Sequence, residues 1–147
     1  MKLKILFLFI IVVSVLSCKQ QKSFDEKGIK AAISANMQEQ ENNWNSANIE
    51  GFMDHYWKSD SLKFIGKRGM TMGWQATLDN YKKGYPDAAA MGRLQFTNLH
   101  MEALDAQNAF VIGKWELFRS ADTLSGHYSL LWKKMNEKWV IVADHSS

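Results

Sequence analysis

Hydrophobic positions along the chain follow two different periods, and the period changes near residue 93. In two segments before that point, mainly apolar side chains recur every three to four residues, which is the spacing of one helical face. These positions are Ile29, Ile33, Met37, the polar Gln40 and Trp44 in the first segment and Ile49, Phe52, Met53, Tyr56 and Trp57 in the second. The pair Ser23 and Glu26 forms a capping box before the first helix, and Asn48 is a plausible N-cap for the second. A third helix is predicted over residues 74–83.

The remaining segments alternate between apolar and polar residues, which indicates strands. A short hairpin is predicted from residues 61–66 and 70–72, and four longer strands from residues 93–104, 109–119, 127–135 and 138–146. The apolar phase switches from Leu94 and Phe96 to Leu99 and Met101, which predicts a β-bulge near Thr97 or Asn98. The expected fold class is therefore α+β, with three N-terminal helices packed in the concave side of a curved antiparallel sheet.

The first residues form a short apolar run behind two lysines, which is typical of an export signal. The run ends in Val15-Leu16-Ser17-Cys18, which resembles a bacterial lipobox, and Cys18 is the only cysteine. The predicted organisation is a lipoprotein signal peptide over residues 1–17, a tether over 18–24 and one domain over 25–147. Lipid attachment at Cys18 predicts anchoring in the bacterial cell envelope, at the outer membrane and facing the periplasm.

Composition narrows the function classes. Apolar residues make up 46% and charged residues 22% of the chain, as in an ordinary globular protein. The formal net charge is only +3, so no nucleic-acid partner is expected. The four histidines, His55, His100, His127 and His145, are scattered without metal-ligand spacing, so neither a metal nor another cofactor is expected.

The final strand, WVIVADHSS, carries an acid, an imidazole and hydroxyls in a row. Neighbouring strand residues point to opposite faces, so Asp144 cannot orient the imidazole of His145 as in a catalytic triad. A two-residue turn at Asn136-Glu137, with regular pairing beyond it, places His145 opposite Tyr128 on the aromatic, charge-free sheet face. The same register sends Asp144 to the other face.

The aromatic side chains of the helices and of this sheet face predict a pocket for a small apolar or aromatic molecule. The predicted lining residues are Trp44, Tyr56, Trp57, Trp74, Trp115, Tyr128, Trp132 and His145. If the pocket is catalytic, His145 is the predicted acid or base and Tyr128 its partner and oxyanion donor.

Several short motifs together resemble the SnoaL-like bacterial branch of the nuclear transport factor 2-like superfamily. They are Trp44-Asn45, Phe52-Met53, Tyr56-Trp57, Gly73-Trp74, Gly113-Lys114-Trp115 and the final strand from Trp139 to Ser147. The resemblance implies a cone with an interior pocket, and a homodimer formed through the outer sheet face. Ketosteroid isomerases of the superfamily use a carboxylate base, and the sheet face predicted here carries no Asp or Glu, so that chemistry is not expected.

Three functions remain open from the sequence. The first is a lipid-anchored module that binds a small apolar molecule in the aromatic pocket. The second is an enzyme that uses a pocket histidine for proton transfer or hydration on a carbonyl compound. The third is a dimerising interaction domain whose aromatic residues are only a packed core.

Overall fold

The computed structural model describes residues 24–147 of the chain. The predicted signal peptide, the lipid-attachment residue Cys18 and all but the last residue of the predicted tether lie outside the described residues. Within residues 24–147 no helix is long and apolar enough to cross a membrane.

The first described helix, α2, covers Glu26–Asn45, and α3 covers Ile49–Met53. Asp25 is the N-cap of α2, because its side chain accepts a hydrogen bond from the Gly28 backbone N at 2.9 Å. Ser23 of the predicted capping box lies outside the described residues. Asn48 caps α3 as predicted, accepting from the Gly51 backbone N at 2.9 Å.

The helix α3 ends before Tyr56 and Trp57, although the apolar stripe continues through both residues. The backbone there turns to pair with the sheet instead. Ile141 N donates to His55 O at 2.8 Å, and Trp57 N donates to Ile141 O at 2.9 Å. Two backbone hydrogen bonds to a central strand thus replace the next helical turn, and Tyr56 is fixed directly above the sheet.

Two short strands and two helices follow. Strands β1 (Lys63–Gly66) and β2 (Gly69–Met72) form the predicted hairpin, and α4 covers Trp74–Gly84. A short helix, α5 (Ala88–Met91), lies between the predicted third helix and the first long strand, where the sequence pattern predicts no element. The Asp87 side chain caps it by accepting from Ala90 N at 2.8 Å. The sequence signal missed there is an ordinary N-cap residue before a run of alanines.

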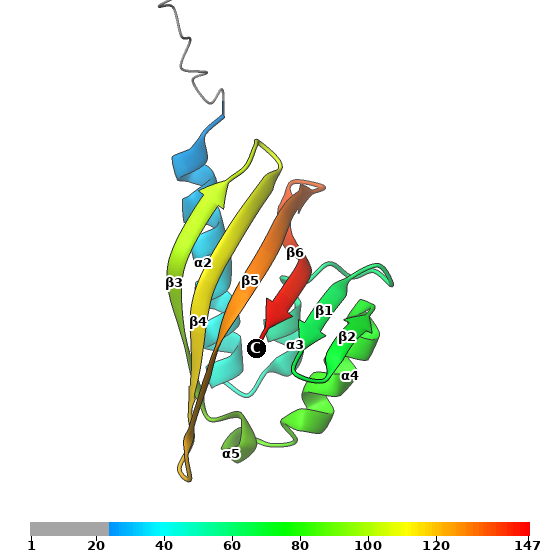
Figure 1. Cartoon of the computed structure of the whole chain (residues 1–147), viewed down its shortest axis with the longest axis vertical. Coiled ribbons are helices and arrows are strands. Elements are labelled where there is room, and N and C mark those ends of the chain that lie inside the picture. The colour runs from blue at the N-terminus through cyan, green and yellow to red at the C-terminus, as the bar shows by residue number, and fades with distance from the viewer. Residues whose placement is uncertain (1–23) are drawn as a thin grey trace, which may run out of the picture.

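The remaining chain forms four long strands, and the α+β prediction is confirmed. They are β3 (Arg93–Ala103), β4 (Asn108–Phe118), β5 (Thr123–Met135) and β6 (Lys138–Ser146). The six-stranded sheet has the order β2-β1-β6-β5-β4-β3 and is antiparallel except for the parallel pair of β1 and β6. The sheet curves around α2, and α4 lies beside the β1–β2 hairpin, at the end of the sheet away from β3 (Figure 1).

Two irregularities interrupt the strand pairing. The first lies between Asn98 and His100 in β3, where the phase switch predicts a bulge. The second lies in the β5–β6 pair: Trp132 faces Ile141, but Leu131 faces Ala143, so Val142 is an extra residue in β6. No phase switch in the β6 sequence predicts this second bulge, and it reverses the faces of every residue after it.

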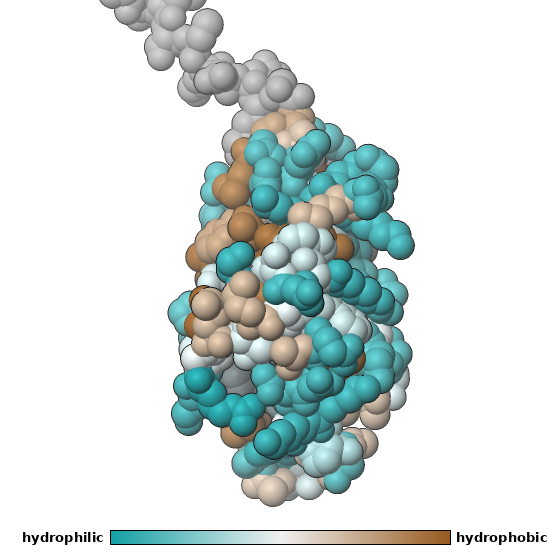
Figure 2. All heavy atoms as spheres, turned by 90° about the vertical axis from the view of Figure 1, so that its right-hand side faces the viewer, coloured by the Kyte–Doolittle hydropathy of each residue, from teal (hydrophilic) through white to brown (hydrophobic). Residues whose placement is uncertain are grey.

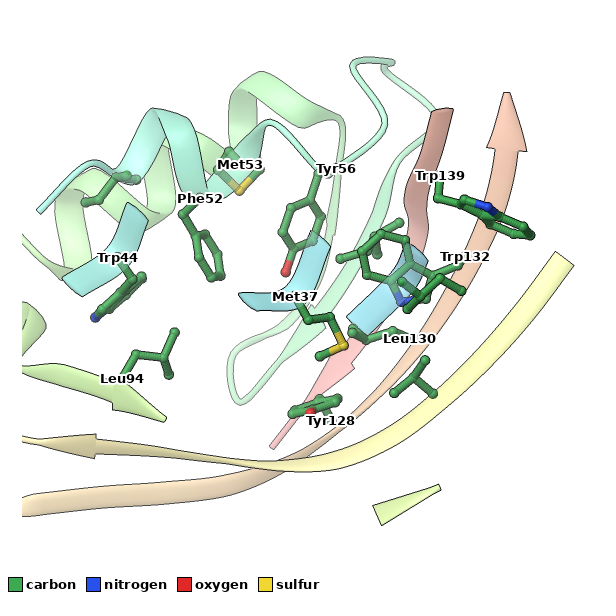
Figure 3. Close-up of a cluster of buried hydrophobic side chains, with 14 of the residues drawn as sticks. Met37, Trp44, Phe52, Met53, Tyr56, Leu94, Tyr128, Leu130, Trp132 and Trp139 are labelled. Atoms are coloured by element: carbon green, nitrogen blue, oxygen red, sulfur yellow. The ribbon is translucent and has the colours of Figure 1, made fainter. Parts of the chain in front are cut away.

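The core divides into a filled end and an aromatic end. Met37, Leu130 and Trp132 lie together at one end, near Trp139, whereas Trp44 and Phe52 lie well apart from them, across from Leu94 (Figure 3). Tyr56 stands between the two groups and directs its hydroxyl into the space between the helices and the sheet (Figure 3). The pocket described next opens at the aromatic end.

Candidate functional site

A pocket of about 780 Å³ lies between the helices and the concave face of the sheet. This volume is in the range of small-molecule sites. The helices, β1 and the segment after α4 contribute an aromatic wall made of Trp44, Phe52, Tyr56, Phe64, Tyr81 and Tyr85. The sheet contributes Leu94, Phe96, Trp115, Leu117, Tyr128 and Leu130. The lining of this cavity is therefore mainly aromatic and apolar on both sides.

Trp44 anchors the aromatic wall at the end of α2. Its indole Nε1 donates to the Met91 backbone O at 3.2 Å, which satisfies the donor and fixes the ring plane. The ring meets Phe52 and Tyr85 edge to face, with centroids 5.1 Å and 4.8 Å away. These T-shaped contacts hold rings from three separate segments in one rigid wall.

Tyr81 joins this wall to the sheet side of the pocket. Its ring contacts Phe52 at 5.4 Å and Phe64 of β1 at 5.6 Å between centroids. Tyr81 and Tyr85 sit four residues apart at the end of α4, so both face the same side of that helix segment. This spacing was the available signal for two pocket residues that the sequence prediction did not include.

Asp144 is the acid of the pocket, and its position corrects the prediction. The extra residue Val142 in β6 moves Asp144 opposite Leu130 on the concave face. Asp144 is only 3% exposed and lines the pocket. The prediction that this face carries no Asp or Glu is therefore wrong, because regular pairing was assumed past Ile141 and the bulge breaks it there.

His145 shows the opposite outcome. It pairs with Ser129, on the convex face, and its side chain is exposed. The predicted pairing of His145 with Tyr128 is wrong, since Ser146 occupies that position. His145 does not line the pocket, so the expected role of this imidazole as the acid or base of a pocket enzyme fails with the register.

Both carboxylate oxygens of Asp144 accept hydrogen bonds. Tyr56 donates its hydroxyl to Oδ2 at 2.6 Å, and Ser146 donates its hydroxyl to Oδ1 at 2.6 Å. Burial nevertheless raises the pKa of Asp144 from 3.8 to about 6, and the two hydrogen bonds and the nearby His145 only partly counter it. Removal from water outweighs them because no basic side chain pairs with this carboxylate in the described part of the chain.

A second tyrosine, Tyr81, lines the pocket with Tyr56 and Asp144. Burial together with the charge of Asp144 raises the pKa of both phenols well above 10. A phenol has one proton to donate, and that of Tyr56 goes to the carboxylate. Both tyrosines therefore stay neutral beside the buried acid.

Tyr128 lies on the sheet floor of the pocket, as predicted, but in a different network. Its hydroxyl donates to Asn98 Oδ1 at 2.7 Å, next to the first bulge. Burial raises the pKa of this phenol as well. Gly113, opposite Tyr128 on β4, leaves the space that the ring occupies, because an added Cβ would collide with the Tyr128 hydroxyl.

The other predicted pocket residues divide between the pocket and its surroundings. Trp115 lines the pocket together with Trp44, Tyr56 and Tyr128. Trp57, Trp74 and Trp132 do not line it. The Trp74 indole Nε1 donates to Met53 O at 2.9 Å, and Trp132 is a fully buried residue of the filled core.

The sequence prediction missed Phe52, Phe64, Tyr81, Tyr85 and Asp144. Phe52 was assigned to the core stripe of its helix, which is also correct, since one residue can pack and line a cavity at once. Among residues 24–147 no group of three or more His, Cys, Asp or Glu side chains is arranged to hold a metal ion.

Comparisons with known proteins identify the family. An NTF2-like protein of unknown function from Shewanella oneidensis MR-1 is 37% identical, with a TM-score of 0.78, over 80% of this chain and 98% of its own. The chain belongs to the NTF2-like family, in agreement with the resemblance found in the sequence.

More distant structures share the fold alone. An NTF2-like superfamily protein from Salmonella enterica serovar Typhimurium is 18% identical with a TM-score of 0.64, covering 82% of this chain and 91% of its own. An NTF2-like protein of unknown function from Pseudomonas putida KT2440 is 12% identical with a TM-score of 0.67, covering 82% and 87%. No family model and no curated protein matches the sequence.

Proposed function

We propose that this protein binds a small, mainly apolar or aromatic molecule in the pocket above Asp144. The observation that carries the proposal is a cavity of about 780 Å³ walled by aromatic rings around one buried acid. A domain that needed only a packed core would gain stability by filling such a space, because cavities cost free energy. The apolar wall supplies affinity, and the few polar groups supply orientation.

The proposed location is the bacterial cell envelope. The lipobox-like residues before Cys18 support a lipid anchor, and Lys19 after the cysteine favours the outer membrane. The proposed assembly is a homodimer through the convex sheet face, where Phe110 and Leu131 pair and Ile112 is 36% exposed. Light scattering of residues 19–147 tests the dimer, which Ile112→Lys is expected to split.

The binding proposal is tested by native mass spectrometry of residues 19–147 purified gently from the source organism. We expect a co-purifying small molecule in the wild type. Leu117→Trp adds a large side chain to the pocket floor and should abolish retention, whereas Leu131→Trp makes the same change on the convex face and should keep it. Protein that stays empty after incubation with a metabolite extract of the host would contradict the proposal and favour the packed-core interaction domain.

Proton transfer at Asp144 is a second candidate function. A carboxylate with a pKa of about 6 in an apolar site is a competent base near neutral pH. It would take a proton from the carbon next to a ligand carbonyl, leaving an enolate and a neutral carboxylic acid, and return the proton at another carbon. If the retained molecule is a ketone, the wild type should exchange its α-protons with D₂O. Asp144→Asn should lose this exchange and His145→Ala should keep it.

A further inference from the structure

The inner end of the pocket is the end that holds Asp144. Tyr56 and Ser146 each donate their hydroxyl proton to one oxygen of this carboxylate. With Asp144 ionised, the further lone pairs of its two oxygens are the acceptors there, and the Tyr81 hydroxyl lines the same pocket. This end therefore suits a ligand hydroxyl, which can donate to the carboxylate and accept from Tyr81.

The charged groups of the lining are distributed unevenly. Within residues 24–147, Asp144 is the only acidic side chain of the lining and is buried, whereas Lys67, Arg68 and Arg119 are basic. Arg119 is neutralised by Asp122, which it meets through two hydrogen bonds of 2.6 Å. Lys67 and Arg68 form the exposed β1–β2 turn, and neither side chain has an ion-pair partner within the described chain.

This turn belongs to the side of the molecule that carries the β1–β2 hairpin and α4, which is mainly hydrophilic (Figure 2). The exposed side chains of Lys67 and Arg68 give the outer end of the pocket a positive charge. A ligand that fills the pocket thus meets the Asp144 carboxylate inside, aromatic rings along its body and unpaired cations outside.

We infer that the ligand is an amphipathic hydroxy acid, bound with its hydroxyl against Asp144 and Tyr81 and its carboxylate beside Lys67 and Arg68. The inference rests on the proposed binding function and specifies the ligand class of the same pocket. A neutral hydroxyl is chosen over an ammonium group because the cationic turn opposes the entry of a cation. The aromatic wall fits a flat or apolar body between the two ends.

Four biphenyl probes test the two ends separately by calorimetry at pH 8, where Asp144 is ionised. They are 4′-hydroxybiphenyl-4-carboxylate, its methyl ester, its 4′-methoxy ether and unsubstituted biphenyl. The hydroxy acid should bind roughly tenfold tighter than the ester, which lacks the anion. It should also bind at least about tenfold tighter than the ether, which leaves the buried acceptors without a proton.

Two double variants test where the carboxylate of the ligand binds. Lys67→Gln/Arg68→Gln should remove most of the preference for the acid over the ester. Lys27→Gln/Lys133→Gln removes the same charge from exposed positions away from the pocket and should keep that preference. In wild-type protein, 0.5 M salt screens charges, so it should weaken binding of the hydroxy acid and leave binding of the methyl ester unchanged.

The outcomes separate the two proposals. One outcome is that the ester or biphenyl binds but the hydroxy acid binds no tighter than the ester. Another is that the tighter binding of the acid survives in Lys67→Gln/Arg68→Gln. Either result overturns the inferred orientation of the ligand and leaves the proposed binding function standing. If the methoxy ether binds as tightly as the hydroxy acid, the inferred contact of the ligand hydroxyl with Asp144 is overturned, and the binding function again stands. If no probe binds the wild type, the inference falls together with the proposed function.

Discussion

At the scale of single residues, the protonation of Asp144 is the most consequential property. The carboxyl group is 3% exposed and has hydroxyl donors on both oxygens, and no basic side chain of residues 24–147 forms an ion pair with it. Hydroxyl donors stabilise a carboxylate less than a cation does, so desolvation sets the direction of the pKa shift. Asp144 therefore changes charge near neutral pH, inside the pocket, where a charge affects both stability and binding.

Asp144 should make the stability of the fold pH-dependent. The pKa of Asp144 is about 6 in the folded protein and 3.8 in the unfolded chain. Protonation of Asp144 therefore stabilises the fold at pH values below 3.8, and this stabilisation is lost as pH rises through 6. The loss is roughly 3 kcal/mol of unfolding free energy. Asp144→Asn stays neutral and keeps the acceptor for Tyr56, so its stability relative to wild type should rise by most of that amount, about 2 kcal/mol, between pH 4 and pH 7 in urea titrations.

His145→Ala is the matched control for this experiment, because it changes the adjacent but exposed side chain. Its unfolding free energy should stay within about 0.5 kcal/mol of wild type at neutral pH. Parallel stability curves for wild type and Asp144→Asn across this pH range would show that Asp144 is not the buried titrating group.

At the scale of elements, the two bulges decide which side chains enter the pocket. The bulge in β3 follows from an apolar phase switch in the sequence and holds Asn98 beside Tyr128. The bulge at Val142 follows no such switch, since Ile141, Val142 and Ala143 are all apolar. Either phase of β6 satisfies the hydrophobic pattern, so pairing with β1 and β5 had to select between them.

The close packing of β4 against β5 is open to a direct test. Gly113→Ala places a Cβ against the ring of buried Tyr128, which must shift and strain its hydrogen bond to Asn98. We expect a loss of about 1–3 kcal/mol in unfolding free energy. Gly84→Ala is the same substitution at the end of α4, where nothing lies within 4 Å, and it should be neutral or slightly stabilising. Equal effects in chemical denaturation would contradict this packing.

At the scale of the whole molecule, the expected attachment to a membrane gives a prediction that does not depend on the pocket. Cys18→Ser removes the only thiol that a lipid could modify. In the source organism the wild type should sediment with the membrane fraction, and the variant should be released into the soluble fraction. Equal amounts of both proteins in the membrane pellet, after a high-salt wash, would rule out a Cys18 anchor.

The sequence by itself determined the α+β class, the order of the elements and most of their limits. The reason is local: helical and strand periods, the Asn48 cap and the Asn136-Glu137 turn are properties of neighbouring residues. It also indicated an aromatic cavity, because Trp44, Tyr56, Trp115 and Tyr128 stand on faces that those periods define.

Tertiary structure alone decided the chemistry of that cavity. One inserted residue in β6 put Asp144 inside and His145 outside, and contact with β6 ended α3 so that Tyr56 reaches the carboxylate. Such choices depend on pairing between segments distant in the chain, where an apolar sequence accepts two registers equally well. The hydrophobic pattern fixes which strands are buried, and only strand pairing fixes which polar side chain is buried with them.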